Sequence, residues 1–406
     1  MKGLGIGVLV GVITLIGSAS GFAQTTPTAD APANPGLRVG PLALSPIVRL
    51  TELGYDSNVY NLSEDLRPVG DFVSTVSPAL QAWFRFGRVR ATGHSQLDMY
   101  YYRTLPSLRS VDTDNGAQVD LVLNRVRLFV GGSRLDTQRR QNFEIDAIAE
   151  RVTDEATVGA EVHVTGKTSF TVSTHRTHLA YAPNSLYLGT DLGQALNHTA
   201  VGETVGLRYA ITPLTLFGVE VVQDRARFES QFDRNSTELR ITPSVEFSPF
   251  ALVSGRASVG FYRRTFSALA PQTGTSALVD LNYTLLGRTR FGISVNRKLE
   301  YSYLTVLYDY IEAGVTGSVT QRLGDSWELS GRLGRARLSY QSAATNVTAA
   351  QVPGETVVTS GVDVGYNLRH TRIGLYVEHN QRDTDQSAPN RGYQRFRIGS
   401  SATYAF

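Results

Sequence analysis

The sequence predicts an all-β fold, a transmembrane antiparallel up-and-down β-barrel of about eighteen strands. Three observations predict it. Apolar and polar residues alternate at a period of two from Ile47 onward, short turns alternate with long polar connections, and the chain ends on an aromatic residue, Phe406. A period of two places apolar side chains on one face of a strand and polar side chains on the other. Since an open sheet edge cannot persist in hydrocarbon, such a sheet must close.

The alternation is plainest in the stretches 277–285 and 291–299. In the first of these, Val279 and Leu281 share one face, whereas Asp280 and Asn282 share the other. In 327–340 the apolar residues change face near Gly334, and we expect a β-bulge there. By this pattern we expect strands at 47–59, 71–86, 88–104, 114–124, 125–138, 150–165, 167–180, 199–211, 213–228, 236–247, 251–266, 274–286, 288–302, 307–323, 325–342, 357–368, 370–384 and 393–406.

The connections between these strands fall into two classes. Short turns are expected at 86–88, 166–167, 287–288 and 324–325, where glycine supplies the positive φ of a tight hairpin. Longer polar connections, such as 60–70, 139–149, 181–198 and 343–356, lie between them. Short periplasmic turns and long outer loops are the pattern of outer-membrane barrels. The loop 181–198, which contains Leu186, Tyr187 and Leu188, is the expected constriction or plug.

The N-terminal segment is typical of an exported protein. Lys2 precedes an apolar run from Leu4 to Ile16, and small residues follow up to Ala23. This pattern predicts a cleaved signal peptide over 1–23, because the apolar run is short for the alternative, a membrane-spanning anchor. Residues 24–46 are rich in Pro, Ala and Thr and are expected to form a flexible periplasmic lead-in. The barrel is then expected over 47–406.

Aromatic residues gather at both ends of the expected strands, as in the interfacial girdles of membrane barrels. Those near the turns are Trp83, Phe84, Phe86, Phe129, Phe217, Phe247, Phe250, Phe291 and Trp327. Those near the loops are Tyr100, Tyr101, Tyr102, Phe261, Tyr262, Phe266, Tyr301, Tyr303, Tyr308 and Tyr310. Tyr404 and Phe406, in phase with Ile398, resemble the terminal signal that the barrel assembly machinery reads.

Charged residues fall on the face opposite the apolar one, which would line the lumen. An arginine facing lipid at the midplane would cost roughly 2–4 kcal/mol, so the energetics agree with this placement. The expected basic residues of the lumen are Arg85, Arg90, Arg127, Arg208, Arg240, Arg256, Arg264, Arg290, Lys298, Arg332 and Arg372. The expected acidic ones are Asp98, Asp120, Glu220, Glu238, Glu246 and Glu378.

A basic-x-Arg phrase recurs after four expected turns, at Arg90, Arg127, Arg290 and Arg372, and places arginine near the periplasmic mouth. The outer loops carry acids instead, among them Glu144 and Asp146. Rings of arginine favour anions in a pore. Two alternatives stay open: the arginines pair with acids across strands, or the turn arginines meet lipid phosphates.

The sequence offers no catalytic or metal-binding phrase, and we expect no enzyme activity, no cofactor and no nucleic-acid partner. There is no cysteine, which excludes disulfides and a lipidated N-terminal cysteine. His175 and His178 lie three apart on one expected strand and hence on opposite faces, so they cannot share a metal ion. The remaining histidines stand in no recognisable catalytic arrangement.

Residues 50–105 resemble the putative β-barrel porin 2 family. The resemblance rests on Gly54-Tyr55-Asp56-Ser57-Asn58-Val59-Tyr60, on Ser77-Pro78-Ala79-Leu80, and on Met99-Tyr100-Tyr101-Tyr102. Asp-x-Asn after a first strand also occurs in other barrels. The resemblance implies a pore in a Gram-negative outer membrane, often associated with exopolysaccharide export. By analogy of fold alone, an eighteen-strand barrel with a basic lumen is also similar to the alginate-export barrel.

These observations together predict a pore for export of an anionic exopolysaccharide or for passage of anionic solutes. A general diffusion porin would instead show a loop folded inward, and a structural or adhesive barrel would have a closed lumen. The partners implied are outer-membrane lipids, the barrel assembly machinery, a polysaccharide and periplasmic export components.

Overall fold

The computed structural model describes residues 36–267, 270–304, 307–341, 354–384 and 391–406. The expected signal peptide, and the lead-in up to residue 35, lie outside this part of the chain. Among the described residues no helix is long and apolar enough to cross a membrane. The secondary structure is almost entirely antiparallel strand, joined into one sheet.

The eighteen strands that form the barrel wall follow one another in chain order. The first nine are β2 (Leu42–Asp56), β3 (Asp71–Phe86), β4 (Val89–Tyr102), β5 (Ser110–Val122), β6 (Val126–Thr137), β7 (Arg151–His163), β8 (Thr168–Tyr181), β11 (His198–Thr212) and β12 (Thr215–Phe228). The others are β13 (Ser236–Phe247), β14 (Val253–Phe266), β15 (Gln272–Leu285), β16 (Thr289–Tyr301), β17 (Asp309–Leu323), β18 (Trp327–Gln341), β19 (Glu355–Leu368), β20 (Thr371–Thr384) and β21 (Tyr393–Ala405). Small elements in the connections are β9 (Leu186–Tyr187), β10 (Thr190–Asp191), the helix α1 (Leu192–Leu196), and the 3-10 turns Glu64–Leu66, Pro106–Leu108 and Phe232–Arg234.

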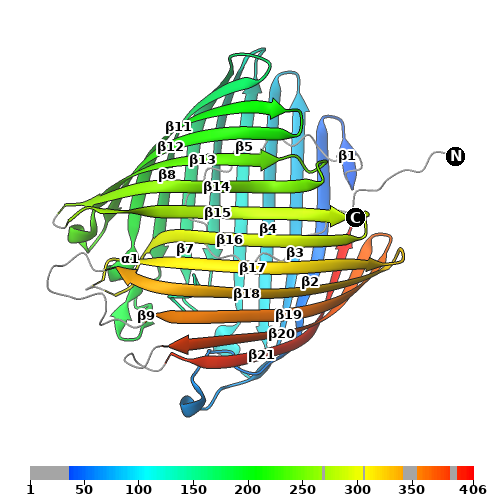
Figure 1. Ribbon diagram of the computed structural model, residues 1–406. Coiled ribbons are helices and arrows are strands. Elements are labelled where there is room, and N and C mark those ends of the chain that lie inside the picture. The colour runs from blue at the N-terminus through cyan, green and yellow to red at the C-terminus, as the bar shows by residue number, and fades with distance from the viewer. Residues whose placement is uncertain (1–35, 268–269, 305–306, 342–353, 385–390) are drawn as a thin grey trace.

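The sheet closes where β2 pairs with β21, from Ile47 opposite Ala405 to Asp56 opposite Arg397. Closure satisfies the backbone groups that an edge would leave unpaired in hydrocarbon. The predicted fold class, a closed antiparallel barrel of eighteen strands, is confirmed. Both ends of the described chain lie at the end of the barrel with the short turns, and the long connections gather at the other end (Figure 1).

The N-terminal boundary of the barrel differs from the expected one. β2 begins at Leu42, and the short strand β1 (Leu37–Val39) pairs back onto its first residues. The part 36–46 of the expected flexible lead-in is therefore largely strand. The sequence did not predict this strand because it contains Pro46, and proline is disfavoured inside a sheet. Here the ladder with β21 starts only at Ile47, so the missing N–H of Pro46 leaves no bond to β21 unmade.

Most of the expected turns are present. Gly87, Gly287 and Gly324 have the positive φ that the tight turns need. Gly166 does not; instead the Thr165 hydroxyl accepts from the N–H groups of Lys167 and Thr168. The bulge expected near Gly334 is absent, because β18 keeps one register with β17 and with β19 throughout.

The seam between β2 and β21 is held by the residues that carry the family resemblance. Arg395 of β21 donates through Nε and Nη2 to both carboxylate oxygens of Asp56, and both residues are largely buried. Asn58, fully buried, donates to the carbonyls of Leu62 and Gln394. The Asp-x-Asn motif thus ties the end of β2 and the first loop to the last strand, which is a structural reason for its position at the end of β2.

We expect Asp56→Ala to destabilise the barrel by about 3 kcal/mol, since removing one partner leaves the Arg395 guanidinium buried without its carboxylate. The measurement is the urea midpoint of the refolded protein in detergent. Glu203→Ala is the matched control, because the Glu203–Arg225 pair is about half exposed on both sides and such pairs contribute little. Equal midpoints for the two variants would contradict a role for Asp56 at the seam.

The C-terminal residue lies just beyond the seam. The N–H of Phe406 donates to the carbonyl of Pro46, and its ring packs edge-on against Tyr404 at 4.6 Å between centroids. Both side chains are about half exposed, so burial gives them little stabilising role. We expect deletion of Phe406 to lower the amount of heat-modifiable barrel in outer-membrane fractions, with the urea midpoint of refolded protein little changed. An unchanged yield in membranes would refute an assembly role.

Candidate functional site: the lumen and the loop that crosses it

The two faces of the wall differ in chemistry. Large apolar residues such as Val205, Leu207 and Ile293 are exposed on one face, as expected for a surface in contact with lipid. Polar residues alternate with them on the other face and are often buried, for example Asp120 and Thr204. In a closed barrel this second face lines the lumen.

Every predicted lumen residue alternates with the exposed apolar residues of its strand and therefore lies on the inner face. The cross-strand registers place Arg85 opposite Arg90, Arg90 opposite Asp120, and Arg256 between Glu246 and Asp280. Arg208 lies opposite Ser169 and Gly218, and Glu220 opposite Gly206 and Thr242. Asp98 accepts from the Gln96 amide. Their role in conduction stays a prediction.

Several of these arginines are ion-paired within the wall. Arg127 donates to Asp120 at 3.2 Å and to Glu161 at 2.6 Å, and all three are buried. Arg332 pairs with Glu378, and Arg372 pairs with Asp363. Charge-assisted bonds of this kind neutralise the guanidinium where it stands. The lumen is thus less basic than its arginine content alone indicates.

A second group of pairs lies nearer the long loops. Arg264 donates to Glu238 at 2.9 Å and to Asp309 at 2.6 Å, while Arg240 donates to the other oxygen of Glu238. Lys298 lies 3.2 Å from Glu300 and 3.8 Å from Glu312. The alternative in which acid and base pair across strands therefore holds for a large part of the predicted set.

The connection 138–150 between β6 and β7, called here the crossing loop, lies inside the long-loop end of the barrel. On one side Arg140 donates to the carbonyl of Val59 at 2.6 Å. On the other, Phe143 packs against the buried cluster of Leu307, Tyr310, Leu338 and Tyr340 from β17, β18 and the connection before them. In strand order β17 lies half-way round the barrel from β6, so the loop spans the mouth.

Two acidic residues anchor the crossing loop. Asp146 pairs with Arg140 of the same loop, accepts from the Asn61 amide at 2.8 Å, and lies 3.5 Å from Arg382 of β20. Glu144 is fully buried and accepts from the Ser302 hydroxyl, and its backbone carbonyl accepts from Arg391. The loop is thereby fixed to the walls near β2, β16 and β20.

Burial raises the pKa of Glu144 from 4.5 to about 8, and the hydrogen bond from Ser302 and the charge of Arg391 offset only part of this rise. A carboxyl with a raised pKa binds its proton more tightly in the docked loop than in a released, hydrated one. The proton therefore favours docking.

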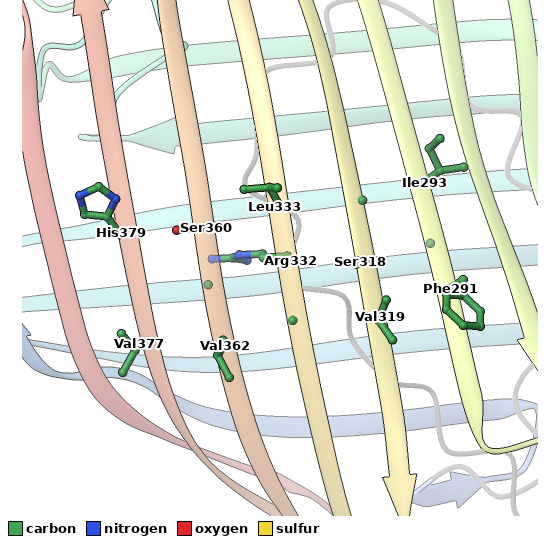
Figure 2. Close-up of a pocket in the computed structure, with 14 residues that line it drawn as sticks. Phe291, Ile293, Ser318, Val319, Arg332, Leu333, Ser360, Val362, Val377 and His379 are labelled. Carbon is green, nitrogen blue, oxygen red and sulfur yellow. The ribbon is translucent and has the colours of Figure 1, made fainter.

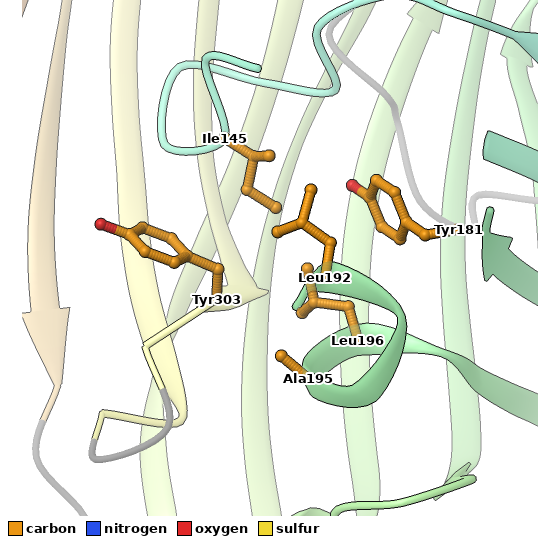
Figure 3. Packing of buried hydrophobic residues seen from close by; sticks show 6 residues of the cluster. All are labelled: Ile145, Tyr181, Leu192, Ala195, Leu196 and Tyr303. Atoms are coloured by element: carbon orange, nitrogen blue, oxygen red, sulfur yellow. The ribbon is translucent and has the colours of Figure 1, made fainter. Parts of the chain in front are cut away.

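The connection between β8 and β11 packs against the crossing loop. Leu192, Ala195 and Leu196 of α1 are buried together with Ile145 and Tyr303, and Figure 3 shows these side chains meeting between the helix and the loops. Arg391 donates to the Tyr187 hydroxyl at 2.8 Å. Leu186 and Leu188, by contrast, are exposed. The two connections together narrow the mouth.

Three sequence-based expectations need correction at this mouth. The expected plug, 181–198, takes part but does not span the barrel; the crossing loop does. The apolar residues after Gly334 point into the lumen, where Leu338 and Tyr340 pack against the crossing loop. The change of apolar face along β18 therefore reflects this packing and not a bulge. Among the expected loop-side girdle, Tyr102, Tyr262, Phe266, Tyr303 and Tyr310 are buried, whereas Tyr101 and Phe261 are exposed. The sequence signal that could have indicated an inward loop is the presence of apolar residues at inner-face positions near a strand end, such as Leu338 and Tyr340 of β18.

The histidines lie as predicted from their spacing. His175 is 3.0 Å from Asp224 on the inner face, and His178 contacts the Thr199 hydroxyl on the outer face. Within the described residues no group of three His, Cys, Asp or Glu side chains is arranged to hold a metal ion.

Docking of the crossing loop should weaken as pH rises. Its proton-linked stabilisation is fully present below about pH 4.5, the pKa of the released carboxyl, and is lost as pH rises through about 8. We expect the single-channel current in planar bilayers to become larger, or to fluctuate more, as the pH is raised from about 6 to about 9. This range brackets the raised pKa of Glu144. Glu144→Gln should remove the pH step, while Glu64→Gln, which changes an exposed loop acid, should keep it. A pH step that survives in Glu144→Gln would exclude this carboxyl.

This chain was compared with curated protein sequences and with solved structures. A search of curated protein sequences finds no match. Among solved structures, OpdL of Pseudomonas aeruginosa is similar at a TM-score of 0.49 and 11% identity over 91% of this chain and 99% of that one. The FrpB iron transporter of Neisseria meningitidis is similar at 0.45 and 10% over 86% of this chain, which spans 63% of FrpB. A bacterial polysaccharide outer membrane secretin gives 0.37 and 10% over 89% of this chain and 98% of that one.

The match to a family model is of a different kind, because it covers the whole barrel. The model described as "Putative beta-barrel porin 2" matches residues 31–406, well beyond the stretch 50–105 that carries the resemblance. The chain therefore belongs to the putative β-barrel porin 2 family.

Proposed function

We propose that this barrel passes anionic solutes across the outer membrane, with the crossing loop narrowing its outer mouth. The observation that carries the proposal is the concentration of arginine on the inner face near the short turns. That end faces the periplasm in barrels of this class. Arginine there raises the local concentration of anions at the entrance.

A small basic cavity supports this proposal. It has a volume of about 80 Å³ and lies at the β15–β16 and β17–β18 turns, among Arg288, Arg290, Arg322 and Glu328. The lining thus contains three arginines and one glutamate, and the Glu328 carboxylate lies 3.5 Å from Arg372. Such a cluster keeps a positive excess even with the acid ionised, and arginine suits carboxylate and phosphate groups.

The ion pairs limit how strong the selectivity can be. Arg127 and Arg372, two of the four arginines in the repeated phrase, already have carboxylate partners. We therefore expect a moderate preference for anions and no strict exclusion of cations. Salt screens such charges over about 10 Å at 0.1 M, so the preference should weaken as salt rises.

Export of an anionic exopolysaccharide is the second candidate. The family resemblance favours it, while the crossing loop opposes it as long as the loop stays docked. A polymer would need the loop released from its anchors at Asp146 and Glu144. A general diffusion porin and a barrel with a closed lumen are each compatible with an inward loop, and they differ in whether the docked state conducts.

We expect the double variant Arg90→Gln with Arg290→Gln to shift the reversal potential toward cation preference, because each change removes an inner positive charge while leaving the Arg127 ion pairs intact. The measurement is the reversal potential across a salt gradient in planar bilayers. Arg134→Gln is the matched control, since it removes an arginine from the outer face, where Arg134 pairs with Asp154.

Three outcomes separate the candidates. An unshifted potential in the double variant would contradict the anion-pore proposal. Transient current blockades by a soluble polyuronate, added on the short-turn side, would favour polymer export. A wild-type protein that never conducts would favour a closed, structural barrel.

A further inference from the structure

The outer face of the barrel is hollowed across β16 to β20. The hollow, called here the outer groove, has a volume of about 750 Å³ and is rimmed by Phe291, Ile293, Val319, Leu333, Val362 and Val377. In Figure 2 the rim side chains lie along the strands, while the Arg332 side chain lies behind the sheet, on the face where it pairs with Glu378 of β20. The groove therefore faces the lipid and is separate from the lumen.

Small residues make the groove. Gly317 and Gly331 stand on the lipid-facing phase of β17 and β18, and a Cβ added at either would meet no atom within 4 Å. Ser360 of β19 continues the floor, opposite Leu333 in register. Most neighbours of these residues on the same face are large and apolar, and His379 of β20 lies opposite Ser360 at one edge of the hollow. The hollow is therefore local to these small residues.

Positive charge lies beside the groove on the long-loop side. Arg335 and Arg337 follow Leu333 on the same face of β18, and both are exposed. Arg297 of β16 shares a row with Arg337, because each lies opposite Ala313 of β17. The nearest acid on that row is Asp383 of β20, beyond Thr356 and in contact with the Gln381 amide.

Arginine on a lipid-facing surface is costly at the midplane, roughly 2–4 kcal/mol, and nearly free at the interface. Three such residues in one patch therefore belong at headgroup level. Guanidinium groups there favour phosphate, which they bind with paired hydrogen bonds. The leaflet concerned is the outer one, since the patch lies on the long-loop side.

We propose that the outer groove and Arg297, Arg335 and Arg337 form a binding site for a phosphorylated, multiply acylated glycolipid of the outer leaflet. The groove spans five strands, a width of roughly 20 Å at the usual strand spacing, which accommodates several acyl chains side by side. Arg297 and Arg337 stand two strands apart, roughly 10 Å, so one headgroup with two phosphates can contact both. A phospholipid, with one phosphate and two chains, uses only part of this surface.

The test is native mass spectrometry of the detergent-purified, folded barrel with two probes: bisphosphorylated lipid A and phosphatidylglycerol. We expect wild-type protein to retain lipid A preferentially. Arg335→Gln with Arg337→Gln should lower its retention at least about tenfold, the factor that corresponds to losing about one charge-assisted hydrogen bond. Gly317→Leu with Gly331→Leu, which fills the groove into open space, should lower retention to a similar extent.

Matched controls lie on the opposite wall. Ala160→Leu adds a leucine to the outer face of β7 between Leu128 and Val172, and Arg134→Gln with Arg176→Gln removes two outer-face charges. Neither should change retention, and all variants should keep the heat-modifiable fold. Equal retention of both lipids would overturn the assignment to a glycolipid. Retention of lipid A that neither double variant lowers would overturn the site itself.

Discussion

The pairing of β2 with β21 is the interaction on which the rest of this structure depends. In hydrocarbon each unpaired backbone group costs several kcal/mol, so the sheet is stable only as a closed cylinder. Asp56, Asn58 and Arg395 secure that seam with side-chain bonds at the long-loop end. Once the seam is closed, the period-two alternation sorts every strand into a lipid-facing and a lumen-facing set, and the arginine-rich lumen follows from it.

Inside the wall, charge is balanced locally. Arg127, Arg264, Arg332 and Arg372 each contact a carboxylate on the same or a nearby strand. Burying such a pair carries a desolvation penalty, and the attraction between the two charges offsets that penalty only when their geometry is good. In this barrel the ion pairs allow charged side chains to line the lumen while the strands stay closely packed. The excess that remains near the short turns is what gives the pore its proposed preference for anions.

The strands were predictable from the sequence because alternation and turn chemistry are local. The strand starts at 71, 236 and 393 were predicted at the residues where they occur. The features that the sequence did not predict are those that depend on contacts between residues far apart in the chain. The strand character of Leu42 to Pro46 depends on β3, and the inward course of 138–150 depends on Tyr310 and Leu338, far away in the chain. The inner or outer phase of each arginine followed from the alternation, but its ion-pair partner on another strand did not.

A barrel wall resists bending within a strand far more than it resists ovalisation, since strands can tilt slightly against their neighbours. The crossing loop begins at β6 and reaches the β17–β18 surface through Phe143, half-way round the barrel in strand order, while Arg140 binds the carbonyl of Val59. The docked loop therefore links separate parts of the barrel wall across the lumen and restrains the distance between them. Releasing it would do more than clear the opening: the cross-section itself would become free to deform, and with it the spacing of charges around the rim.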